Sequence, residues 1–499
     1  MRRMKPEKIV LGIVAGVSGV LLVLFLFWHL RLGMTRYFDA DEFAHMHWAS
    51  HFVMGNRPYV DFLMFFPPGF ILFLAPLFVF GWGTTAPLLA GRVEIFIIFT
   101  LTCIVASLLF WDMRKSPLAL MAGALLAFLP MPFDKYLEIR PDNLATLFVL
   151  IGMWLQIRWM RTGGKRWGFW SGICYALSLL VLPKMVPNVA VAAGIAVLAW
   201  RKNPRMLVSA GTGFVVPFAT FGVWILTLGD IGKVFYSLTK LPLEANRISQ
   251  YFIMMPDLFF YPNGIFYGEN GYNPGLMTNH AVWIVGLCMG IYRLITPFLT
   301  RGKKHVWEEL LIAGTFIVQV MAYVQIVPLK HTQYLIPIGV FVAWYAADGL
   351  FWLWEHARKL PVVGTVAYLV VFTGLSVYLY NTFVRINTPK LAWTNTEMLA
   401  GLSELYKKIP KTEYVLDLEG GTLYYPDPYY ACCLPFGQFS SFLSQPLPSL
   451  VEALKRTQTK YIFQGGLMRT TTLTPQDKAY VTEHFLPAGD GSLLVAREK

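Results

Sequence analysis

Long apolar segments recur along this chain, and they constrain its fold more than any other feature. Several approach the roughly 20 residues that an α-helix needs to cross a bilayer. The first runs from Ile9 to Leu30, which is too long for a typical signal peptide, so we interpret it as a retained span. Only 14% of the residues are charged, whereas soluble domains have roughly 25%. The sequence therefore predicts an α-helical polytopic membrane protein.

Basic residues are concentrated in short clusters between the apolar segments, and these clusters predict the topology. The formal net charge is +13, but no cluster combines basic and aromatic residues as nucleic-acid sites do, so we expect no nucleic-acid partner. Basic loops favour the cytoplasmic side, where they also contact membrane lipid headgroups. This rule places the N-terminus in the cytoplasm and predicts about eleven spans. The later basic clusters lie at 114–115, 158–166, 201–205, 301–304 and 358–359.

One apolar stretch does not fit this alternation as a span. If the segment from Pro68 to Trp82 crossed the membrane, every later basic cluster would face outward. Its ~15 residues are also fewer than a span requires. We therefore predict that it is interfacial or re-entrant on the outer side.

The composition changes after Lys390, and the last hundred residues have the pattern of a small α/β domain. We predict strands at 411–417, 460–464 and 493–497, and helices at 450–457 and 475–484. The five cysteines indicate no disulfide framework, and we assign no role to Cys432 and Cys433. The predicted organisation is a transmembrane module at 1–390 followed by a domain at 391–499 outside the membrane.

Ionisable residues concentrate in the predicted outer segments. The first outer loop carries Asp39, Asp41 and Glu42 within four positions, and His45 lies on the same helical face as Asp41. Acidic residues are also favoured at helix starts, so this spacing alone leaves a capping role open. The other candidates have similar alternatives, namely capping, lysine snorkelling or interfacial anchoring. They are Tyr59, Asp61, Arg92, Arg140, Asp142, Lys184, Lys330 and His331.

These alternatives become less probable when they must hold at every outer span end. We therefore expect the side chains to converge on one pocket at the membrane surface. A carboxylate there could act as a general base towards an acceptor hydroxyl, while Arg and Lys neutralise a leaving phosphate. Such a pocket suits glycosyl transfer from a lipid-phosphate sugar. A transporter or lipid flippase is the alternative, but we see no internal repeat, and the charges cluster at one face.

At these residues the chain resembles the GT-C superfamily of glycosyltransferases. It is most similar to the family 39-like group, which includes protein mannosyltransferases and the lipid A aminoarabinose transferase. The motifs that carry the resemblance are Asp41-Glu42, Pro58-Tyr59-x-Asp61-Phe62 followed by Pro67-Pro68, Arg140-Pro141-Asp142, and His331-x-Gln333-Tyr334.

The resemblance implies an inverting transfer from a polyprenyl-phosphate sugar donor to an extracytoplasmic glycan, lipid or protein acceptor. It places the enzyme in a bacterial plasma (inner) membrane, with the C-terminal domain periplasmic or extracellular. The aminoarabinose enzymes have an acidic-basic pair where this chain has Phe65 and Phe66. The resemblance therefore does not imply lipid A as the acceptor, nor a metal site at this pair. No cofactor is predicted with certainty, and a divalent metal ion stays an alternative.

The resemblance also implies that the catalytic candidates are Asp41, with Glu42 beside it, and Asp142. From their placement in the outer segments, the substrate-binding candidates are Arg140, Lys184, Lys330, His331, Tyr59, Asp61, His45 and Arg92.

Overall fold

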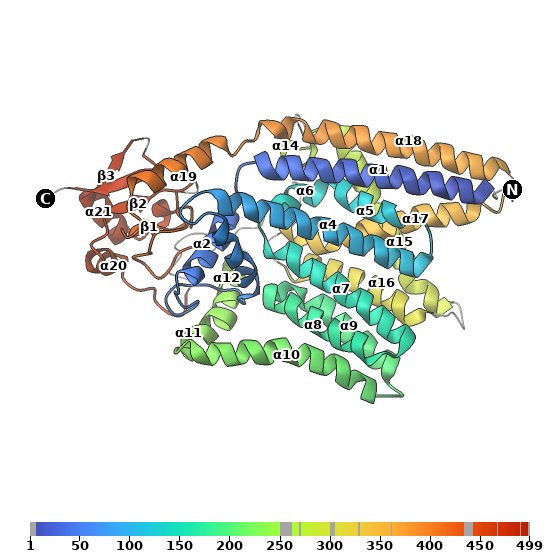
Figure 1. The fold of residues 1–499 in the computed structure, drawn as a ribbon, viewed down its shortest axis with the longest axis horizontal. Helices are drawn as coiled ribbons and strands as arrows, with labels where there is room; N and C mark the ends of the chain where they lie inside the picture. The colour runs from blue at the N-terminus through green and yellow to red at the C-terminus, as the bar shows by residue number, and fades with distance from the viewer. Residues whose placement is uncertain are drawn as a thin grey trace.

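The computed structural model describes residues 6–249, 262–268, 271–299, 305–327, 330–360, 362–433, 443–466, 468–489 and 491–497. The molecule is elongated, and its long helices run side by side along its length (Figure 1). Helix α1 begins at one end, and the small C-terminal domain occupies the opposite end. The C-terminal domain is therefore at the end of the helical bundle opposite to the N-terminus.

Within the described residues, nine helices are long and apolar enough to cross a membrane. Two shorter helices, α5 (Ala119–Phe128) and α8 (Lys165–Val181), also belong to the bundle, so the structure shows nine candidate spans and shorter helices where the sequence predicts about eleven spans. The predicted basic cluster at 301–304 lies outside the described residues. The nine long helices are α1 (Pro6–Thr35), α4 (Ala86–Arg114), α7 (Pro141–Thr162), α9 (Val186–Trp200, extended by η2, Pro183–Met185), α10 (Arg205–Thr227), α15 (Asn273–Leu299), α16 (Val306–Gln325), α17 (Ile336–Ala357) and α18 (Val362–Asn387).

The apolar stretch before α4 is confirmed as too short to span. It forms α3 (Gly69–Leu74) and the 3₁₀ helix η1 (Ala75–Phe80). At 1.5–2 Å per residue, these helices cover less than the ~30 Å hydrocarbon core. The other short elements are α2 (Ala40–Val53), α6 (Pro130–Leu137), α11 (Ile231–Phe235), η3 (Tyr236–Lys240), α12 (Leu241–Ser249), α14 (Gly264–Tyr267), η5 (Thr332–Leu335) and η6 (Pro389–Ala392).

Glycines allow α8 and α10 to approach each other closely. A Cβ atom on Gly172 would lie 2.1 Å from the carbonyl oxygen of Ala210, and one on Gly213 would lie 2.0 Å from that of Phe169. Membrane helices associate through close packing of small residues, because lipid provides little hydrophobic drive between them. These two glycines therefore set the distance between the two helices.

The C-terminal domain is a mixed four-stranded sheet with flanking helices, as predicted. The strands β1 (Val415–Asp417), β2 (Tyr461–Phe463), β3 (Phe485–Ala488) and β4 (Leu493–Ala496) lie in the order β1-β2-β4-β3. The β1 and β2 strands are parallel, with Leu416 opposite Ile462, and the other pairs are antiparallel. The strand β3 and the helix α19 were not predicted from the sequence. The helices are α19 (Thr396–Lys408), α20 (Leu450–Arg456), η8 (Arg469–Thr472) and α21 (Pro475–His484).

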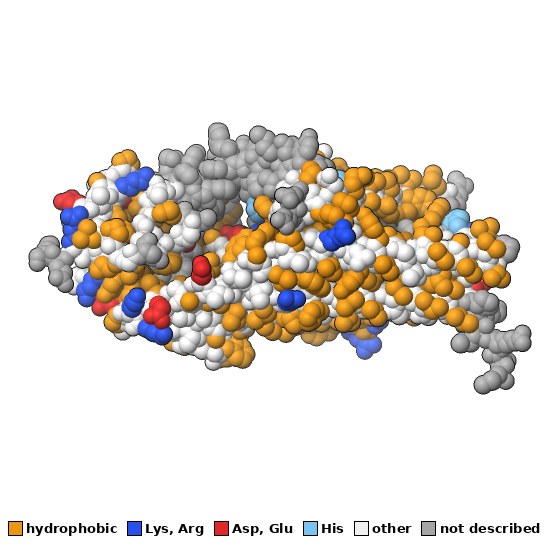
Figure 2. All heavy atoms as spheres, turned by 90° about the horizontal axis from the view of Figure 1, so that it is seen from above, with side chains coloured by type: hydrophobic (Ala, Val, Ile, Leu, Met, Phe, Trp, Pro, Cys, Tyr) orange, Lys and Arg blue, Asp and Glu red, His pale blue; other side chains and the backbone are white. Residues whose placement is uncertain are grey.

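The first loop connects the helical bundle to the C-terminal domain. Helix α2 lies between the ends of the long helices and the sheet (Figure 1). The backbone N–H of Leu63 donates to the carbonyl of Tyr430 at 2.9 Å, and the Tyr430 hydroxyl donates to the carbonyl of Tyr59 at 2.6 Å. On the face shown in Figure 2, hydrophobic side chains cover much of the long helices, while charged ones gather around the C-terminal domain. This contrast fits an apolar bundle joined to a water-facing domain.

Candidate active site

The beginning of α2 is fixed by a capping box. The Asp39 carboxylate accepts from the backbone N–H of Asp41 at 3.0 Å, and the Glu42 carboxylate accepts from the N–H of Asp39 at 2.8 Å. These bonds satisfy amide donors that an uncapped helix end would leave unpaired. Asp39 thus has the capping role that the acidic spacing left open. Asp41, which follows in the first turn, has a side chain that is 48% exposed.

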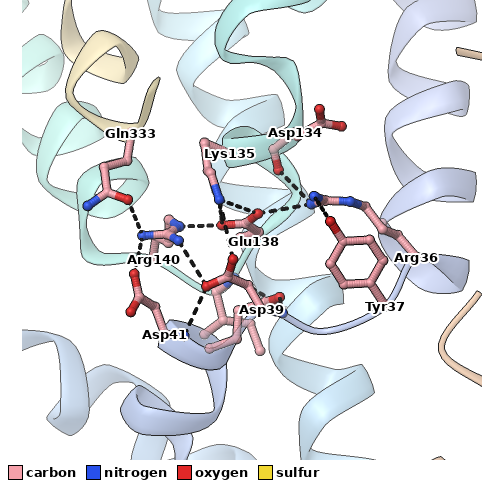
Figure 3. Close-up of polar contacts among 12 residues, drawn as sticks. Arg36, Tyr37, Asp39, Asp41, Asp134, Lys135, Glu138, Arg140 and Gln333 are labelled. Carbon is pink, nitrogen blue, oxygen red and sulfur yellow. Dashed lines mark hydrogen bonds and ion pairs between the residues drawn. The ribbon is translucent and has the colours of Figure 1, made fainter. Parts of the chain in front are cut away.

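A buried charge network opposes this acidic helix start (Figure 3). Arg140 lies in the extended link between α6 and α7, and its Nη1 donates to Asp41 Oδ2 at 2.8 Å. Its Nη2 donates to Asp39 Oδ1 at 3.2 Å, and its Nε to the fully buried Glu138. Gln333 accepts from Arg140 Nη1 at 2.7 Å, so the guanidinium is held from four sides.

Glu138 is the centre of this network. Its carboxylate accepts from Lys135 Nζ at 2.8 Å and from Arg36 Nη1 at 2.9 Å, in addition to Arg140. Three cations thus surround one buried carboxylate. Burial alone would raise the pKa of Glu138, but these cations hold it well below the usual range. The network leaves an excess of positive charge beside Asp41.

Asp41 and Arg140 line a pocket of about 370 Å³. Side chains from the first loop, the α6–α7 link, η2, α12, η5 and the C-terminal domain form its walls, so elements distant in sequence meet there. Six of the predicted site residues are among them. The lining includes Asp41, His45, Trp48, Phe65, Phe66, Arg140, Asp142, Lys184, His331, Gln333, Tyr334, Cys433 and Arg469.

Lys184 directs its ammonium group towards this pocket. Its Nζ lies 4.0 Å from Asp142 Oδ1 and 3.9 Å from the centre of the Tyr334 ring. Asp142 is almost fully buried at the start of α7, where Pro141 occupies the first helical turn. The Lys184 ammonium thus lies against Asp142 and Tyr334 of the protein, whereas a snorkelling lysine would extend its ammonium to water or lipid headgroups.

The titratable groups around the pocket have shifted pKa values. Partial desolvation in the pocket would raise the pKa of Asp41, but Arg140, His45 and Lys135 lower it to about 2. Burial lowers the pKa of His45 to about 3, and burial together with Lys135 and Arg140 lowers that of His331 to about 4. At neutral pH the site therefore holds an ionised aspartate and two neutral imidazoles.

The structure places five predicted site residues outside the described lining of this pocket. Glu42 and Arg92 are buried and pair with each other, and Arg92 also donates to the carbonyls of Gly33 and Tyr37. Tyr59 is buried and donates to the carbonyl of Phe66 at 2.7 Å. The remaining two are Asp61, which pairs with Arg57 at 2.9 Å, and Lys330, which donates to the carbonyls of Tyr323, Val324 and Val327 at the end of α16.

Sequence reasoning missed several residues of the site. Glu138 and Lys135 lie beside the recognised Arg140 motif, and their charge in a short link between spans was a usable signal. Arg469 and Cys433 come from the C-terminal domain and reach the pocket through tertiary packing alone. Trp48, Phe65 and Phe66 form an aromatic wall, with the Trp48 and Phe65 ring centres 5.4 Å apart.

In the described part of the chain, the metal-ligating side chains that lie close together are centred on His47, beside the pocket. Two groups of three close ligand side chains occur there, and both contain His47 of α2. Asp41 and Asp142 belong to neither group. Among the described residues, the groups of close ligand side chains therefore give no support to a divalent ion bound by Asp41 or Asp142.

Comparisons with known proteins identify the fold. No family model matches the sequence, and a search of curated proteins finds no significant match. Among solved structures, ArnT from Cupriavidus metallidurans bound to undecaprenyl phosphate is similar, with a TM-score of 0.59 at 13% identity. The match covers 96% of this chain and 97% of that one.

A second similar structure is the Archaeoglobus fulgidus oligosaccharyltransferase tethered to an acceptor peptide. Its TM-score is 0.53 at 12% identity, and the match covers 97% of this chain and 74% of that one. The chain thus shares the overall fold of these two proteins, which agrees with the fold that the resemblance implies. Its helical architecture with a C-terminal domain is that of ArnT.

Proposed function

We propose that this protein is a membrane glycosyltransferase that moves a sugar from a polyprenyl-phosphate donor to an acceptor outside the cytoplasm. The observation that carries the proposal is the ion pair of Asp41 with Arg140 at one pocket wall, with Lys184 and Asp142 at the same pocket. This combination supplies a base and cations for a leaving phosphate. The fold shared with ArnT, whose structure contains undecaprenyl phosphate, supports the donor class.

The reaction would proceed by inversion at the anomeric carbon. The acceptor oxygen forms a bond to that carbon while the bond from the carbon to the donor phosphate oxygen breaks. Asp41 takes the acceptor proton, and the lipid phosphate leaves with the bonding electron pair. The half-exposed Asp41 carboxylate can reach an acceptor, whereas Glu42 is fully buried and engaged by Arg92. We therefore propose Asp41 as the base and Glu42 as a positioning residue.

Arg140 and Lys184 would receive the charge that develops on the leaving phosphate. Charge-assisted hydrogen bonds to phosphate are strong, and a preorganised guanidinium costs little reorganisation. A phosphate that binds Arg140 competes with Asp41 for the same Nη1. Donor binding would then weaken the hold of Arg140 on Asp41 and raise the basicity of the carboxylate when the acceptor arrives.

The decisive experiment is transfer of label from radiolabelled polyprenyl-phosphate sugars to a cell-envelope extract by the purified full chain. We expect label in the acceptor fraction with the wild type and transfer that is about 10²- to 10⁴-fold slower with Asp41→Asn. Movement of intact donor across proteoliposomes without transfer, in both proteins, would instead support a transporter or flippase.

A further inference from the structure

A second cluster of polar side chains lies outside the pocket, between α2 and the C-terminal domain. His47 and His51 are one helical turn apart on α2 and therefore share a face. At ~100° per residue this face is rotated by about 120° around the helix from the one that presents Asp41 and His45 to the pocket. Asp427 approaches it from the loop that follows β1.

The three side chains converge in a buried space. His47 Nε2 lies 2.9 Å from Asp427 Oδ2, and His51 Nε2 lies 3.6 Å from the same oxygen. Both imidazoles are almost fully buried, and the Asp427 side chain is 9% exposed. One ligand atom from each residue lies within 4.8 Å of the other two.

An ion pair alone accounts for only part of this arrangement. The His47–Asp427 contact uses one ring nitrogen, but His47 Nδ1 and His51 Nε2 have no hydrogen-bond partner among the described residues. Buried polar atoms are usually paired, and leaving them unpaired costs free energy. A cation among these atoms would give His51 Nε2 the partner that it lacks.

The donor set indicates which cation fits. Two histidines at i and i+4 on a helix with one carboxylate from elsewhere form a common zinc arrangement, with Zn–N and Zn–O distances of about 2.0–2.2 Å. Imidazole ligands disfavour Mg²⁺ and Ca²⁺, which prefer oxygen. Cys432 and Cys433 also lie near His47, but they are joined to each other by a disulfide and offer no thiolate.

We propose that His47, His51 and Asp427 bind Zn²⁺, and that this ion fastens α2 to the C-terminal domain. Asp41 lies less than two turns before His47 on α2, and Cys433, six residues after Asp427, lines the pocket. The metal would thus act as a positioning element for the pocket walls. It lies outside the pocket, so the proposal does not depend on which reaction takes place there.

The test is the metal content of the full chain, purified in detergent with an affinity tag that contains no histidine. We expect roughly one zinc ion per chain by mass spectrometry in the wild type, and a loss of most of it in His47→Gln, His51→Gln and Asp427→Asn. The control variants His356→Gln and Glu483→Gln remove the same chemical groups outside the cluster and should keep the zinc. Equal zinc content in all five variants would overturn the proposal.

Wild-type protein provides a measurement that does not depend on the folding of variants. After the metal is stripped by a chelator, added Co²⁺ should produce the visible absorption of a four-coordinate site, and added Zn²⁺ should remove it and raise the thermal midpoint. X-ray absorption should show a first shell of nitrogen and oxygen. No Co²⁺ spectrum, or a shell dominated by sulfur, would reject this site even if sugar transfer is demonstrated. Zinc binding with no transfer would reject only the proposed enzyme function.

Discussion

Asp41 and Arg140 form an ion pair in which Arg140 Nη1 lies 2.8 Å from Asp41 Oδ2, although 98 residues separate them in the chain. The partners differ in their surroundings, because Arg140 is buried and has three further side-chain partners, whereas half of the Asp41 side chain is exposed. The aspartate can therefore exchange its partner for a substrate more easily than the arginine can.

This difference leads to the first prediction, for Asp41→Asn. The variant keeps size and most hydrogen bonding but cannot accept a proton, so we expect transfer to fall about 10²- to 10⁴-fold with donor binding largely intact. Asp39→Asn is the matched control, because asparagine caps helices about as well as aspartate does. Rates are measured at equal protein concentration. Inactive Asp39→Asn with active Asp41→Asn would move the base to Asp39, and two active variants would refute the first-loop mechanism.

The second prediction concerns the donor phosphate. Lys184→Ala should weaken donor binding by about 10- to 100-fold, because one charged hydrogen bond contributes about 1.5–3 kcal/mol. Lys330→Ala is the matched control, because its ammonium donates to three backbone carbonyls at the end of α16. Binding is measured by titration with a polyprenyl phosphate. Equal affinity of both variants and the wild type would indicate that Lys184 has only a structural role.

The third prediction follows from His331. The lowered pKa of about 4 keeps its imidazole neutral, so donor affinity should not increase between pH 7.5 and pH 5.5. An increase centred near pH 6.5 that His331→Gln abolishes would show that a charged imidazole binds the phosphate.

The same shift affects stability. The unfolded chain takes up the His331 proton near the ordinary pKa of 6.5, whereas the folded chain does so only near 4. Neutral His331 therefore contributes stability above pH 6.5 that is lost as the pH falls through this window. His331→Gln should show a smaller fall in thermal midpoint between pH 6.5 and pH 4 than the wild type. An identical fall would contradict the assignment.

The fourth prediction concerns the packing of α8 against α10. Gly172→Ala places a methyl group against the carbonyl of Ala210, so we expect a loss of about 1–3 kcal/mol in the free energy of unfolding. Gly211→Ala is the control, because no atom lies within 4 Å of its added Cβ and alanine favours helix. Thermal midpoints in detergent distinguish the two. Equal midpoints would mean that α8 and α10 separate without cost.

The fifth prediction is the sidedness of the C-terminal domain. In a Cys288→Ser background, Lys407→Cys on α19 should react with an impermeant maleimide in cells whose outer envelope is permeable, because Lys407 is well exposed. Lys165→Cys, at the start of α8, should react only after the inner membrane is lysed. The reverse pattern would invert the topology.

The sequence by itself determined the elements that local chemistry controls. Apolar segments of sufficient length predicted the membrane helices, because backbone groups in lipid must pair within the segment. A capping role for the acidic residues of the first loop followed from local spacing, because a capping carboxylate accepts from amides of its own helix turn. Short polar motifs at the outer span ends predicted that eleven side chains converge, and six of them line one pocket, namely Asp41, His45, Arg140, Asp142, Lys184 and His331.

Only the tertiary structure decided which charges face that pocket and which are already paired. Glu42 directly follows Asp41 and is of the same chemical type, yet it is buried against Arg92 from α4. Arg469 and Asp427 reach α2 and the pocket from the C-terminal domain, hundreds of residues later. A side chain's partner depends on long-range packing and burial, which spacing along one segment does not encode, and this is why neighbouring acids in the sequence occupy different environments in the fold.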